Sequence, residues 1–231
     1  MSVSTKPLTT TAALPSHRDY AGAAGVLITK VVKRLFDVVA SSIAIIILTP
    51  VWLILWLLVR SGDSGPAFFT QQRVGLHGQH FTMYKFRTMC INAEKLKASL
   101  AQANNADTSV GNAIMFKMED DPRITPIGKI LRKLSLDELP QLFNVLKGDM
   151  SLVGPRPPLP SEVAQYEPKV LGKFQVKPGI TGLWQVSGRS NLSWEESVEL
   201  DLHYANNLSL GLDAWILWRT VPALLRQEGA C

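Results

Sequence analysis

Two adjacent carboxylates, Asp137 and Glu138, are the residues of this sequence best placed to do chemistry. Ser135 and Glu138 form an S-x-x-E pattern, which predicts a capping box at the start of a helix. A helix N-terminus favours an ionised carboxylate and attracts phosphate oxygens. An ionised carboxylate beside a second one can act as a nucleophile or hold Mg²⁺. The same pattern recurs at Ser193 and Glu196, so helix capping alone also explains it.

Cationic side chains make a phosphate site near this acidic pair plausible, although each one alone also fits a solvated surface charge. Arg156 lies between Pro155 and Pro157, whose fixed φ angles stiffen the loop. An arginine fork binds phosphate with two hydrogen bonds, whereas lysine acts more as a point charge. The candidate phosphate ligands from the residues alone are Lys85, Arg87, Arg123, Arg132 and Arg156.

Composition and missing motifs exclude several other classes of protein. Two cysteines in 231 residues rule out a disulfide scaffold and a cysteine-based zinc cluster, and the four histidines form no HExxH pair. The sequence contains no GxGxxG after a strand, no Walker A loop and no GxSxG elbow. A net charge of +5 is mild, and we expect no nucleic-acid partner.

One apolar run, residues 38–59, contains no charged residue and is long enough to cross a bilayer. Lys30, Lys33 and Arg34 precede it, which for a simple span places the N-terminus in the cytoplasm and the rest outside. Thr49 and Pro50 divide the run, because proline removes a backbone hydrogen bond and kinks a helix. The residues alone leave two alternatives open: a crossing helix with a tolerated proline, or a helix that enters one leaflet and returns.

The remaining sequence predicts a mixed α/β domain that is mainly helical. We expect a flexible arm over residues 1–29, the membrane segment over 30–60 and one compact domain over 61–231. Strands are predicted at 68–74 and 79–86, and helices at 91–102, at 127–134, from Ser135 to Lys147 and from Ser193. A terminal helix over 214–226 mixes tryptophan with arginine, which suits an interfacial amphipathic helix or a core-packed one.

Five long motifs resemble the bacterial sugar transferases, the monotopic phosphoglycosyl transferases that begin glycan assembly on a polyprenyl phosphate. The resemblance covers about residues 30–226, in the same order and spacing. The motifs are KFRTM at 85–89, DPR at 121–123, LRKLSLDELPQL at 131–142, GDMSLVGPRP at 148–157 and KPGITGLWQVSGR at 177–189.

The resemblance implies that Asp137 and Glu138 are a catalytic dyad. Asp137 would attack the β-phosphate of a UDP-sugar, release UMP and pass the sugar phosphate to undecaprenyl phosphate, with Mg²⁺ held by Glu138 and Asp137. The residues implied for the phosphates and the nucleotide are Lys85, Arg87, Arg123, Arg132, Gln141 and Arg156. Direct attack by the lipid phosphate in a ternary complex, and an inactive membrane scaffold, are the alternatives to this mechanism.

The resemblance also implies a re-entrant membrane helix, with Thr49 and Pro50 in place of the family's Ser-Pro kink. Because UDP-sugars are cytoplasmic, the domain is then expected on the cytoplasmic face of the bacterial inner membrane. The short N-terminal arm suggests a small, exopolysaccharide-initiating member that transfers a hexose 1-phosphate, galactose or glucose first. The sequence leaves open whether the chain forms a homodimer.

Overall fold

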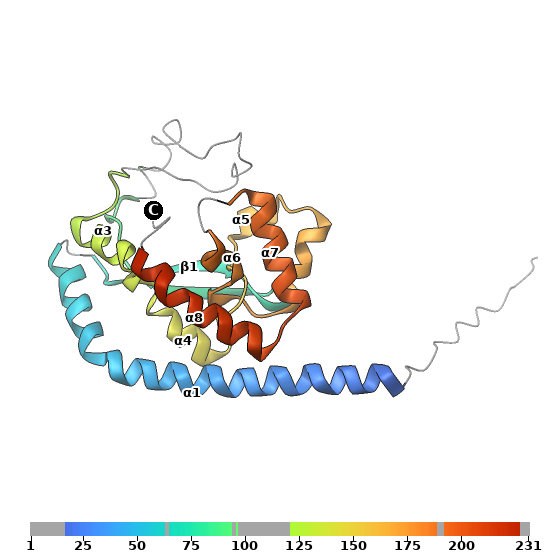
Figure 1. The fold of residues 1–231 in the computed structure, drawn as a ribbon. Helices are drawn as coiled ribbons and strands as arrows, with labels where there is room; N and C mark the ends of the chain where they lie inside the picture. Colours follow the sequence, from blue (N-terminus) through green and yellow to red (C-terminus); the bar gives the residue numbers. More distant parts are fainter. Residues whose placement is uncertain (1–16, 63–64, 94–95, 97–120, 189–191, 227–231) are drawn as a thin grey trace, which may run out of the picture.

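The fold, taken from a computed structural model, consists of one long helix and a compact domain of short helices and strands (Figure 1). The structure describes residues 17–62, 65–93, 96, 121–188 and 192–226. The elements are α1 (His17–Gly62), β1 (Phe68–Val74), η1 (Leu76–Gly78), β2 (His80–Phe86), α3 (Pro126–Lys133), η4 (Leu136–Glu138), α4 (Gln141–Lys147), β3 (Ser151–Val153), α5 (Pro160–Val163), η5 (Pro168–Gln175), β4 (Gly179–Thr181), α6 (Leu183–Ser187), α7 (Trp194–Asn206) and α8 (Leu210–Arg226).

The apolar run lies within α1, which bends where Pro50 interrupts it (Figure 1). Pro50 has no N–H to donate to the preceding turn, and the Thr49 hydroxyl donates to the Ile45 carbonyl at 2.8 Å. The helix begins at His17, so residues 17–29 of the expected arm are helical, while residues 1–16 lie outside the described residues. The segment after the bend turns toward α3.

Both parts of α1 pack against the same domain. After the bend, Leu55 and Val59 are buried with Phe86 and Leu131 in one apolar cluster. The Trp52 ring meets the Phe86 ring edge-on, with 6.0 Å between their centroids. Before the bend, Asp37 and Ser41 are buried, although the run around them is apolar. The domain therefore fills the angle between the two parts of the helix.

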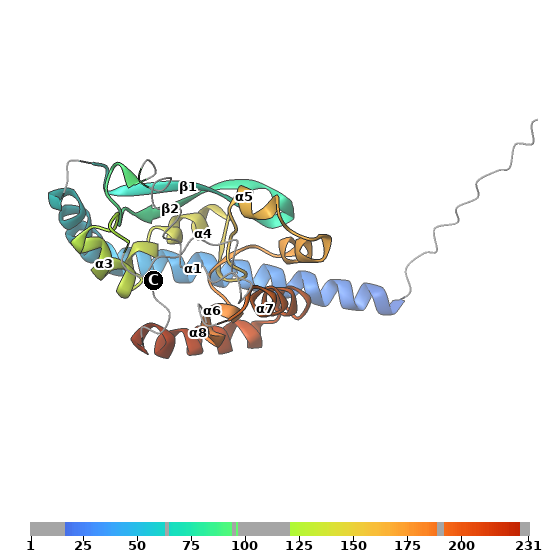
Figure 2. The same cartoon turned by 90° about the horizontal axis from the view of Figure 1, so that it is seen from above.

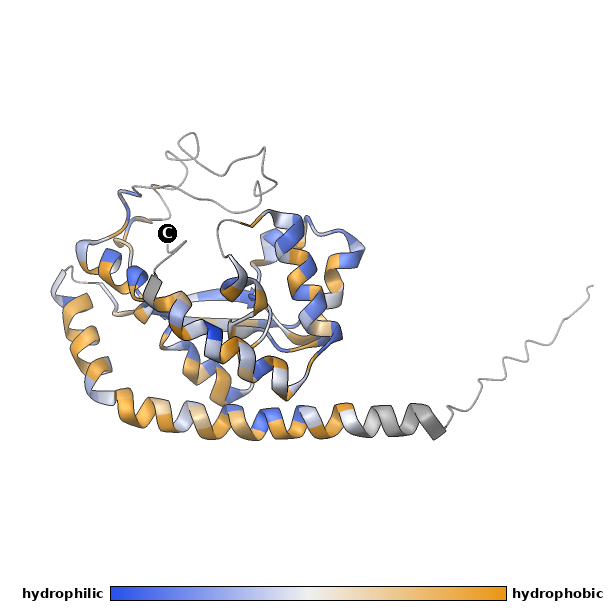
Figure 3. Cartoon of the chain, viewed as in Figure 1, coloured by the Kyte–Doolittle hydropathy of each residue, from blue (hydrophilic) through white to orange (hydrophobic). Residues whose placement is uncertain are grey.

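Many apolar side chains of α1 are exposed, and most of its ribbon is coloured as hydrophobic in Figure 3. Gly25–Gly62 is long and apolar enough to cross a membrane, and only 11% of its most apolar 18-residue window is buried in the protein. A core helix of a soluble protein would bury most of that window. This exposure indicates a helix that associates with a membrane. The exposed apolar side chains before the bend include Val31, Val32, Leu35, Phe36, Val39, Ile43, Ile46 and Ile47.

Two small sheets carry the rest of the domain. β1 and β2 form an antiparallel hairpin in which Phe69 pairs with Lys85, as the two predicted strands require. β3 and β4 are parallel, with Ser151 opposite Gly179 and Val153 opposite Thr181. Each of these sheets has only two strands, and such a pair is marginally stable without packing partners. The helices must therefore supply what holds each pair in place.

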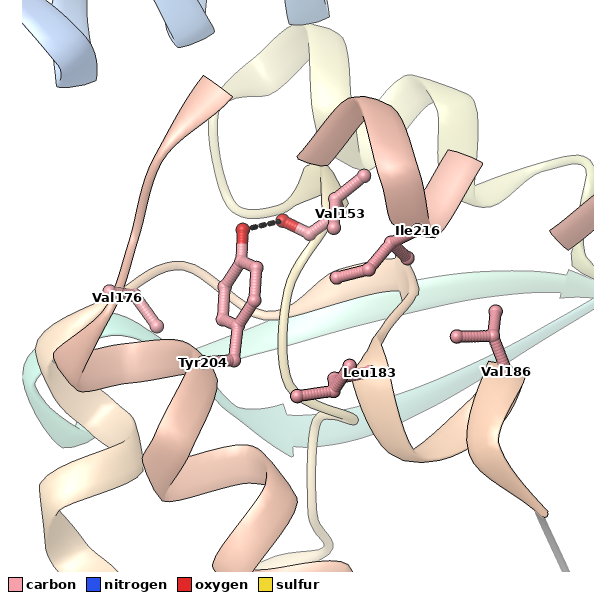
Figure 4. Close-up of a cluster of buried hydrophobic side chains, with 6 residues drawn as sticks. All are labelled: Val153, Val176, Leu183, Val186, Tyr204 and Ile216. Carbon is pink, nitrogen blue, oxygen red and sulfur yellow. Dashed lines mark hydrogen bonds between the residues drawn. The ribbon is translucent and has the colours of Figure 1, made fainter. Parts of the chain in front are cut away.

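The C-terminal helices cover β3 and β4 through a buried cluster of six residues shown in Figure 4: Val153, Val176, Leu183, Val186, Tyr204 and Ile216. In α8, Ile216 is fully buried whereas Trp218 is 77% exposed. Arg219 lies over the Trp215 ring, 5.6 Å from its centroid. One face of the terminal helix packs on the core, as the core-packed alternative predicts. The other face presents tryptophan and arginine to the outside, and its position at a membrane interface stays a prediction.

Helix boundaries agree with the sequence for α3 and α7 and differ after Ser135. The Ser193–Glu196 capping box is present, with both hydrogen bonds formed at 2.8 and 3.1 Å. Ser135 instead takes a left-handed conformation, with φ of 54°, and its side chain caps nothing. The predicted helix start at Ser135 is therefore wrong: a single 3-10 turn comes first, and α4 begins at Gln141. Most of the predicted helix 91–102 falls outside the described residues.

Candidate active site

The acidic pair lies on η4, the tight turn between α3 and α4. A left-handed Ser135 ends α3 and redirects the chain, and Pro140 precedes the first residue of α4. Left-handed φ is uncommon outside glycine, so this turn is held by its surroundings rather than by local preference. Its consequence is that Asp137 points inward and is 8% exposed, while the side chain of Glu138 is 32% exposed. The two neighbouring carboxylates thus have different environments.

Lys85 joins the two carboxylates. Its Nζ donates to Glu138 Oε1 at 2.8 Å and lies 3.7 Å from Asp137 Oδ2. Burial raises the pKa of Asp137, and the Lys85 ammonium opposes that rise. Lys85 is the penultimate residue of β2, so the hairpin places this cation beside η4. The sequence prediction that Lys85 meets the acidic pair is therefore matched by the geometry.

Arg132 extends the positive charge on the other side of Asp137. It lies in the last turn of α3, where its Nε donates to the Thr88 hydroxyl at 3.0 Å. Its charge lowers the pKa of both Asp137 and Asp121. Gly128 lets α3 approach this closely, because an added Cβ would stand 2.0 Å from the Thr88 carbonyl oxygen. The KFRTM and LRKLSLDELPQL motifs thus meet at one place.

Arg123 and Arg87 are buried close to this region of the fold. The Arg123 guanidinium makes a two-pronged contact with Asp121, from Nε at 2.8 Å and from Nη2 at 2.6 Å. That contact lowers the pKa of Asp121. Arg87 is 8% exposed and packs against Gly65, where an added Cβ would lie 2.3 Å from its Nη1. A phosphate role for either arginine stays a prediction.

Arg156 is held by an ion pair to a buried carboxylate. Its Nη1 lies 3.1 Å from Glu162 Oε2, and that oxygen also accepts from the Leu159 amide at 2.7 Å. The stiff Pro155–Pro157 loop predicted from sequence therefore carries a fixed guanidinium, 29% exposed. Nothing in the contacts places it on a nucleotide, so that role also stays a prediction.

Sequence reasoning missed Arg73, which connects the Arg156 loop to the acidic pair. Arg73 Nη1 donates to the Pro157 carbonyl at 2.9 Å, and its Nε is buried without a partner among the described residues. Burial and the neighbouring Arg156 charge lower the pKa of Arg73 to about 10. Glu138 and Glu162 act in the opposite direction, so Arg73 lies within electrostatic reach of both. A charged residue inside a strand gave no signal of burial.

Asn144 was missed as well, and it fixes α4 on the hairpin. Its amide donates to the Thr82 carbonyl at 2.7 Å and accepts from the Tyr84 amide at 3.0 Å. Asn144 is fully buried, as is Gln141 at 3% exposure on the preceding turn of α4. These contacts hold η4 opposite Lys85. The DELPQL sequence included Gln141 as a site residue, but an asparagine within a helix gave no hint of its function.

Among the described residues, the candidate ligands for a metal ion are the carboxylates of Asp137 and Glu138. Within the described ranges, no three histidine, cysteine, aspartate or glutamate side chains cluster as metal ligands. Two carboxylates fit Mg²⁺ all the same, because this ion is usually held by one or two carboxylates together with substrate phosphates and water. The Lys85 ammonium contacts both carboxylates and offsets part of their charge, and Mg²⁺ at this pair stays a prediction.

Comparison with known proteins decides the family. Residues 28–227 match the family model described as bacterial sugar transferase. The chain belongs to this family. The sugar transferase is 47% identical to an undecaprenyl-phosphate galactose phosphotransferase of Salmonella typhimurium over 198 residues, which are 86% of this chain and 41% of the relative. It therefore spans about two-fifths of that protein's length.

Two further relatives are similar to this chain over most of its length. The exopolysaccharide production protein ExoY of Sinorhizobium fredii is 41% identical over 86% of this chain and 87% of its own length. A UDP-N-acetylgalactosamine-undecaprenyl-phosphate N-acetylgalactosaminephosphotransferase of Aeromonas hydrophila is 38% identical over 86% of this chain and 45% of its own. Two of these three relatives are named as undecaprenyl-phosphate sugar phosphotransferases, one for galactose and one for N-acetylgalactosamine.

Proposed function

We propose that this chain transfers a sugar 1-phosphate from a UDP-sugar to undecaprenyl phosphate and releases UMP. The observation that carries the proposal is the juxtaposition of Asp137 and Glu138 with Lys85 and Arg132, in a domain packed on an exposed apolar helix. Such a site joins a nucleophilic carboxylate to cations that neutralise phosphate, at a membrane where a lipid phosphate is within reach.

The transfer proceeds in two displacement steps at the same phosphorus atom. In the first, an Asp137 carboxylate oxygen bonds to the β-phosphorus of the UDP-sugar, and the bond from that phosphorus to the bridging oxygen breaks. The electron pair leaves with UMP. In the second, an oxygen of undecaprenyl phosphate bonds to the same phosphorus and expels the Asp137 carboxylate. Phosphoryl transfer of this kind depends on positioning and charge neutralisation more than on a strong base.

The surroundings of Asp137 suit the nucleophile's role. Burial removes water from the carboxylate and raises its pKa, while Lys85 and Arg132 favour the ionised form that attacks. Glu138, the more exposed partner, is held by Lys85 at 2.8 Å. Asp137 and Glu138 would hold Mg²⁺ together with the diphosphate of the substrate, and the ion would supply neutralisation of the charge on the leaving UMP.

The geometry of α1 supports a re-entrant membrane segment. The domain contacts α1 from Lys33 to Val59, which at about 1.5 Å per residue is about 39 Å of helix. That exceeds the roughly 30 Å apolar core of a bilayer. A straight crossing helix cannot touch one soluble domain at both of these points. A re-entrant segment with both ends of the apolar run on one side of the membrane accounts for both contacts, and we expect that side to be the cytoplasmic one because UDP-sugars are cytoplasmic.

Accessibility labelling distinguishes the two membrane arrangements. Lys30→Cys and Ser61→Cys, each in a Cys90→Ser, Cys231→Ser background, place single thiols at the exposed ends of the apolar segment. A membrane-impermeant maleimide should label both only when it reaches the cytoplasmic face, as in inverted vesicles. Labelling of the two thiols from opposite faces would instead establish a crossing helix.

A panel of UDP-sugars tests the reaction and reads out the sugar. The purified full chain in lipid nanodiscs is supplied with undecaprenyl phosphate and Mg²⁺, and UMP release is measured for each donor. We propose a hexose, galactose first, because the relative with 47% identity is named for galactose. UDP-N-acetylgalactosamine is the second donor to test. No UMP from any donor would contradict the proposal.

Trapping the intermediate separates the two chemical routes. A donor labelled in the sugar phosphate is mixed with the full chain without lipid acceptor and quenched after one turnover. We expect label on the peptide that carries Asp137, and none in the Asp137→Asn variant. No labelled peptide in this mixture, together with UMP release once undecaprenyl phosphate is added, would favour direct attack by the lipid phosphate in a ternary complex.

A further inference from the structure

Three charged side chains on one turn of α1 face the domain rather than the outside. The Lys33 side chain is 11% exposed, Arg34 is partly buried, and Asp37 is 2% exposed. Their neighbours Leu35 and Phe36 are exposed and apolar. Placing a charge against protein requires partners, because an unpaired buried charge is costly. The partners of these three residues show what this turn does, and we refer to Lys33, Arg34 and Asp37 as the polar turn.

Asp37 supplies a hydrogen bond that β3 cannot obtain from a strand. Ser151 and Val153 face β4 in the parallel pair, so the Leu152 N–H between them points to the opposite edge. There it donates to Asp37 Oδ1 at 3.0 Å. The carboxylate thus takes the place of a third strand and prevents a buried amide from being left unpaired. This hydrogen bond fixes the position of β3 along the axis of α1.

Lys33 fixes the next residue of β3. Its Nζ donates to the Val153 carbonyl at 3.0 Å and to Asp213 Oδ2 at 2.6 Å. The same carbonyl accepts from the Tyr204 hydroxyl, drawn in Figure 4, and Tyr204 also donates to Asp213 Oδ1 at 2.7 Å. Asp213 and Lys33 are about nine-tenths buried. One carbonyl therefore ties α1, β3, α7 and α8 together.

Arg34 completes the polar turn at α4. Its guanidinium donates to the carbonyls of Val145 and Leu146, the latter at 2.7 Å. Carbonyls at a helix C-terminus have no partner within the helix, and a cation there is favoured by the macrodipole. The opposite end of α4 follows directly on the turn of Asp137 and Glu138. The polar turn thus holds α4, which follows the turn of the acidic pair, and β3, which leads into the Arg156 loop.

We propose that Asp37 and Lys33 are positioning residues that set the 154–157 loop, and with it Arg156, relative to the membrane helix. β3 runs directly into this loop, and its last residue is the one that Lys33 binds. The inference rests on the proposed function and on the prediction that Arg156 binds the nucleotide side of the UDP-sugar. Neither residue touches substrate; each acts through the backbone of Leu152 or Val153.

The test compares variants that remove or keep each hydrogen bond in the full chain in nanodiscs. Asp37→Leu removes the acceptor of the Leu152 amide, whereas Asp37→Asn keeps an acceptor oxygen. Lys33→Met removes the donor to Val153, and Lys30→Met is the matched control, since Lys30 is exposed three residues earlier. The readouts are KM for the UDP-sugar, kcat for UMP release, and hydrogen–deuterium exchange at the Leu152 amide.

We expect Asp37→Leu and Lys33→Met to raise KM by about tenfold, with a smaller change in kcat, because loss of position weakens binding by the loop. Exchange at Leu152 should accelerate about tenfold in Asp37→Leu and stay near wild type in Asp37→Asn and Lys30→Met. A merely structural role would lower the active fraction, and so kcat, at unchanged KM. Unchanged KM in both Asp37→Leu and Lys33→Met overturns the proposal.

The exchange measurement keeps this inference separable from the proposed function. If the wild-type chain releases no UMP from any donor, the function fails while Leu152 exchange still tests the Asp37 contact. If Asp37→Leu does not fold, Lys33→Met carries the test through KM, with Lys30→Met as its control. Leu152 exchange that is equal in wild type and a folded Asp37→Leu overturns the inference whatever the activity.

Discussion

Replacing Lys85 by methionine should shift the pH dependence of transfer toward alkaline pH. Lys85 Nζ is 3.7 Å from Asp137 and 2.8 Å from Glu138, and it opposes the rise that burial causes in the pKa of Asp137. Without the ammonium the protonated form of Asp137 persists to higher pH. Methionine preserves the length of the side chain, so the change isolates the charge.

The size of the effect follows from the distance. Two unit charges about 4 Å apart interact by about 1 kcal/mol in water and about 4 kcal/mol at an effective dielectric of 20. Lys85 is 25% exposed and Asp137 11% by side chain, so the pair belongs between these limits. About 1.4 kcal/mol corresponds to a tenfold change in an equilibrium. The ratio of ionised to protonated Asp137 at a given pH should therefore fall by about tenfold to about a thousandfold.

The assay is the pH profile of single-turnover UMP release by the full chain in nanodiscs. The acid limb of the Lys85→Met profile should lie at higher pH than that of wild type, with partial recovery of rate in alkaline buffer. Lys133→Met, an exposed lysine on α3, is the control and should leave the profile in place. An acid limb that does not move in Lys85→Met would refute the assignment of Lys85 as the cation that keeps Asp137 ionised.

Three further predictions address the acidic pair and the packing around it. Asp137→Asn should abolish transfer yet raise the melting temperature at neutral pH, because an ionised buried carboxylate with a raised pKa destabilises the fold. In the wild-type chain this destabilisation grows as the pH rises from about 4 through the raised pKa of Asp137. Melting curves should therefore show a higher melting temperature for Asp137→Asn at pH 7.5 but not at pH 4. Gly128→Ala should cost about 1–3 kcal/mol in urea unfolding and lower transfer, because its Cβ would meet the Thr88 carbonyl, whereas Gly211→Ala, with open space around it, should not. Asp201→Asn should cost about 3–5 kcal/mol of unfolding free energy by leaving the buried Lys173 unpaired; a loss under 1 kcal/mol would contradict this reading of the pair.

The sequence predicted those parts of the fold that depend on local periodicity. A two-residue alternation predicts the strand pair, and a 3.6-residue period predicts α3. Residue chemistry predicts the capping box of α7 and the interruption of α1 at Pro50. The turn at Ser135 did not follow, because a serine in the left-handed region has no local signal. Tertiary contacts of α3, β2 and α4 impose that conformation and cancel the expected helix cap.

The charged residues of the candidate site could be predicted from the sequence, whereas the residues that act through burial could not. Lys85, Asp137, Glu138 and Arg132 could be grouped from their types and from the resemblance of their motifs. Arg73 could not, because an arginine in a strand is expected to face water, and only the fold shows that it supports the Pro157 carbonyl. The same is true of Lys33 and Asp37, which come just before the apolar run and whose partners lie more than a hundred residues further along the chain.

The domain's dependence on α1 has a consequence for how the protein matures. Leu55 and Val59 complete the apolar cluster around Phe86 and Leu131, and Arg34 and Asp37 satisfy backbone groups of α4 and β3. Residues 61–231 without α1 would leave these groups wet or unpaired. That segment expressed alone should therefore behave as an aggregation-prone intermediate rather than as a detachable soluble enzyme.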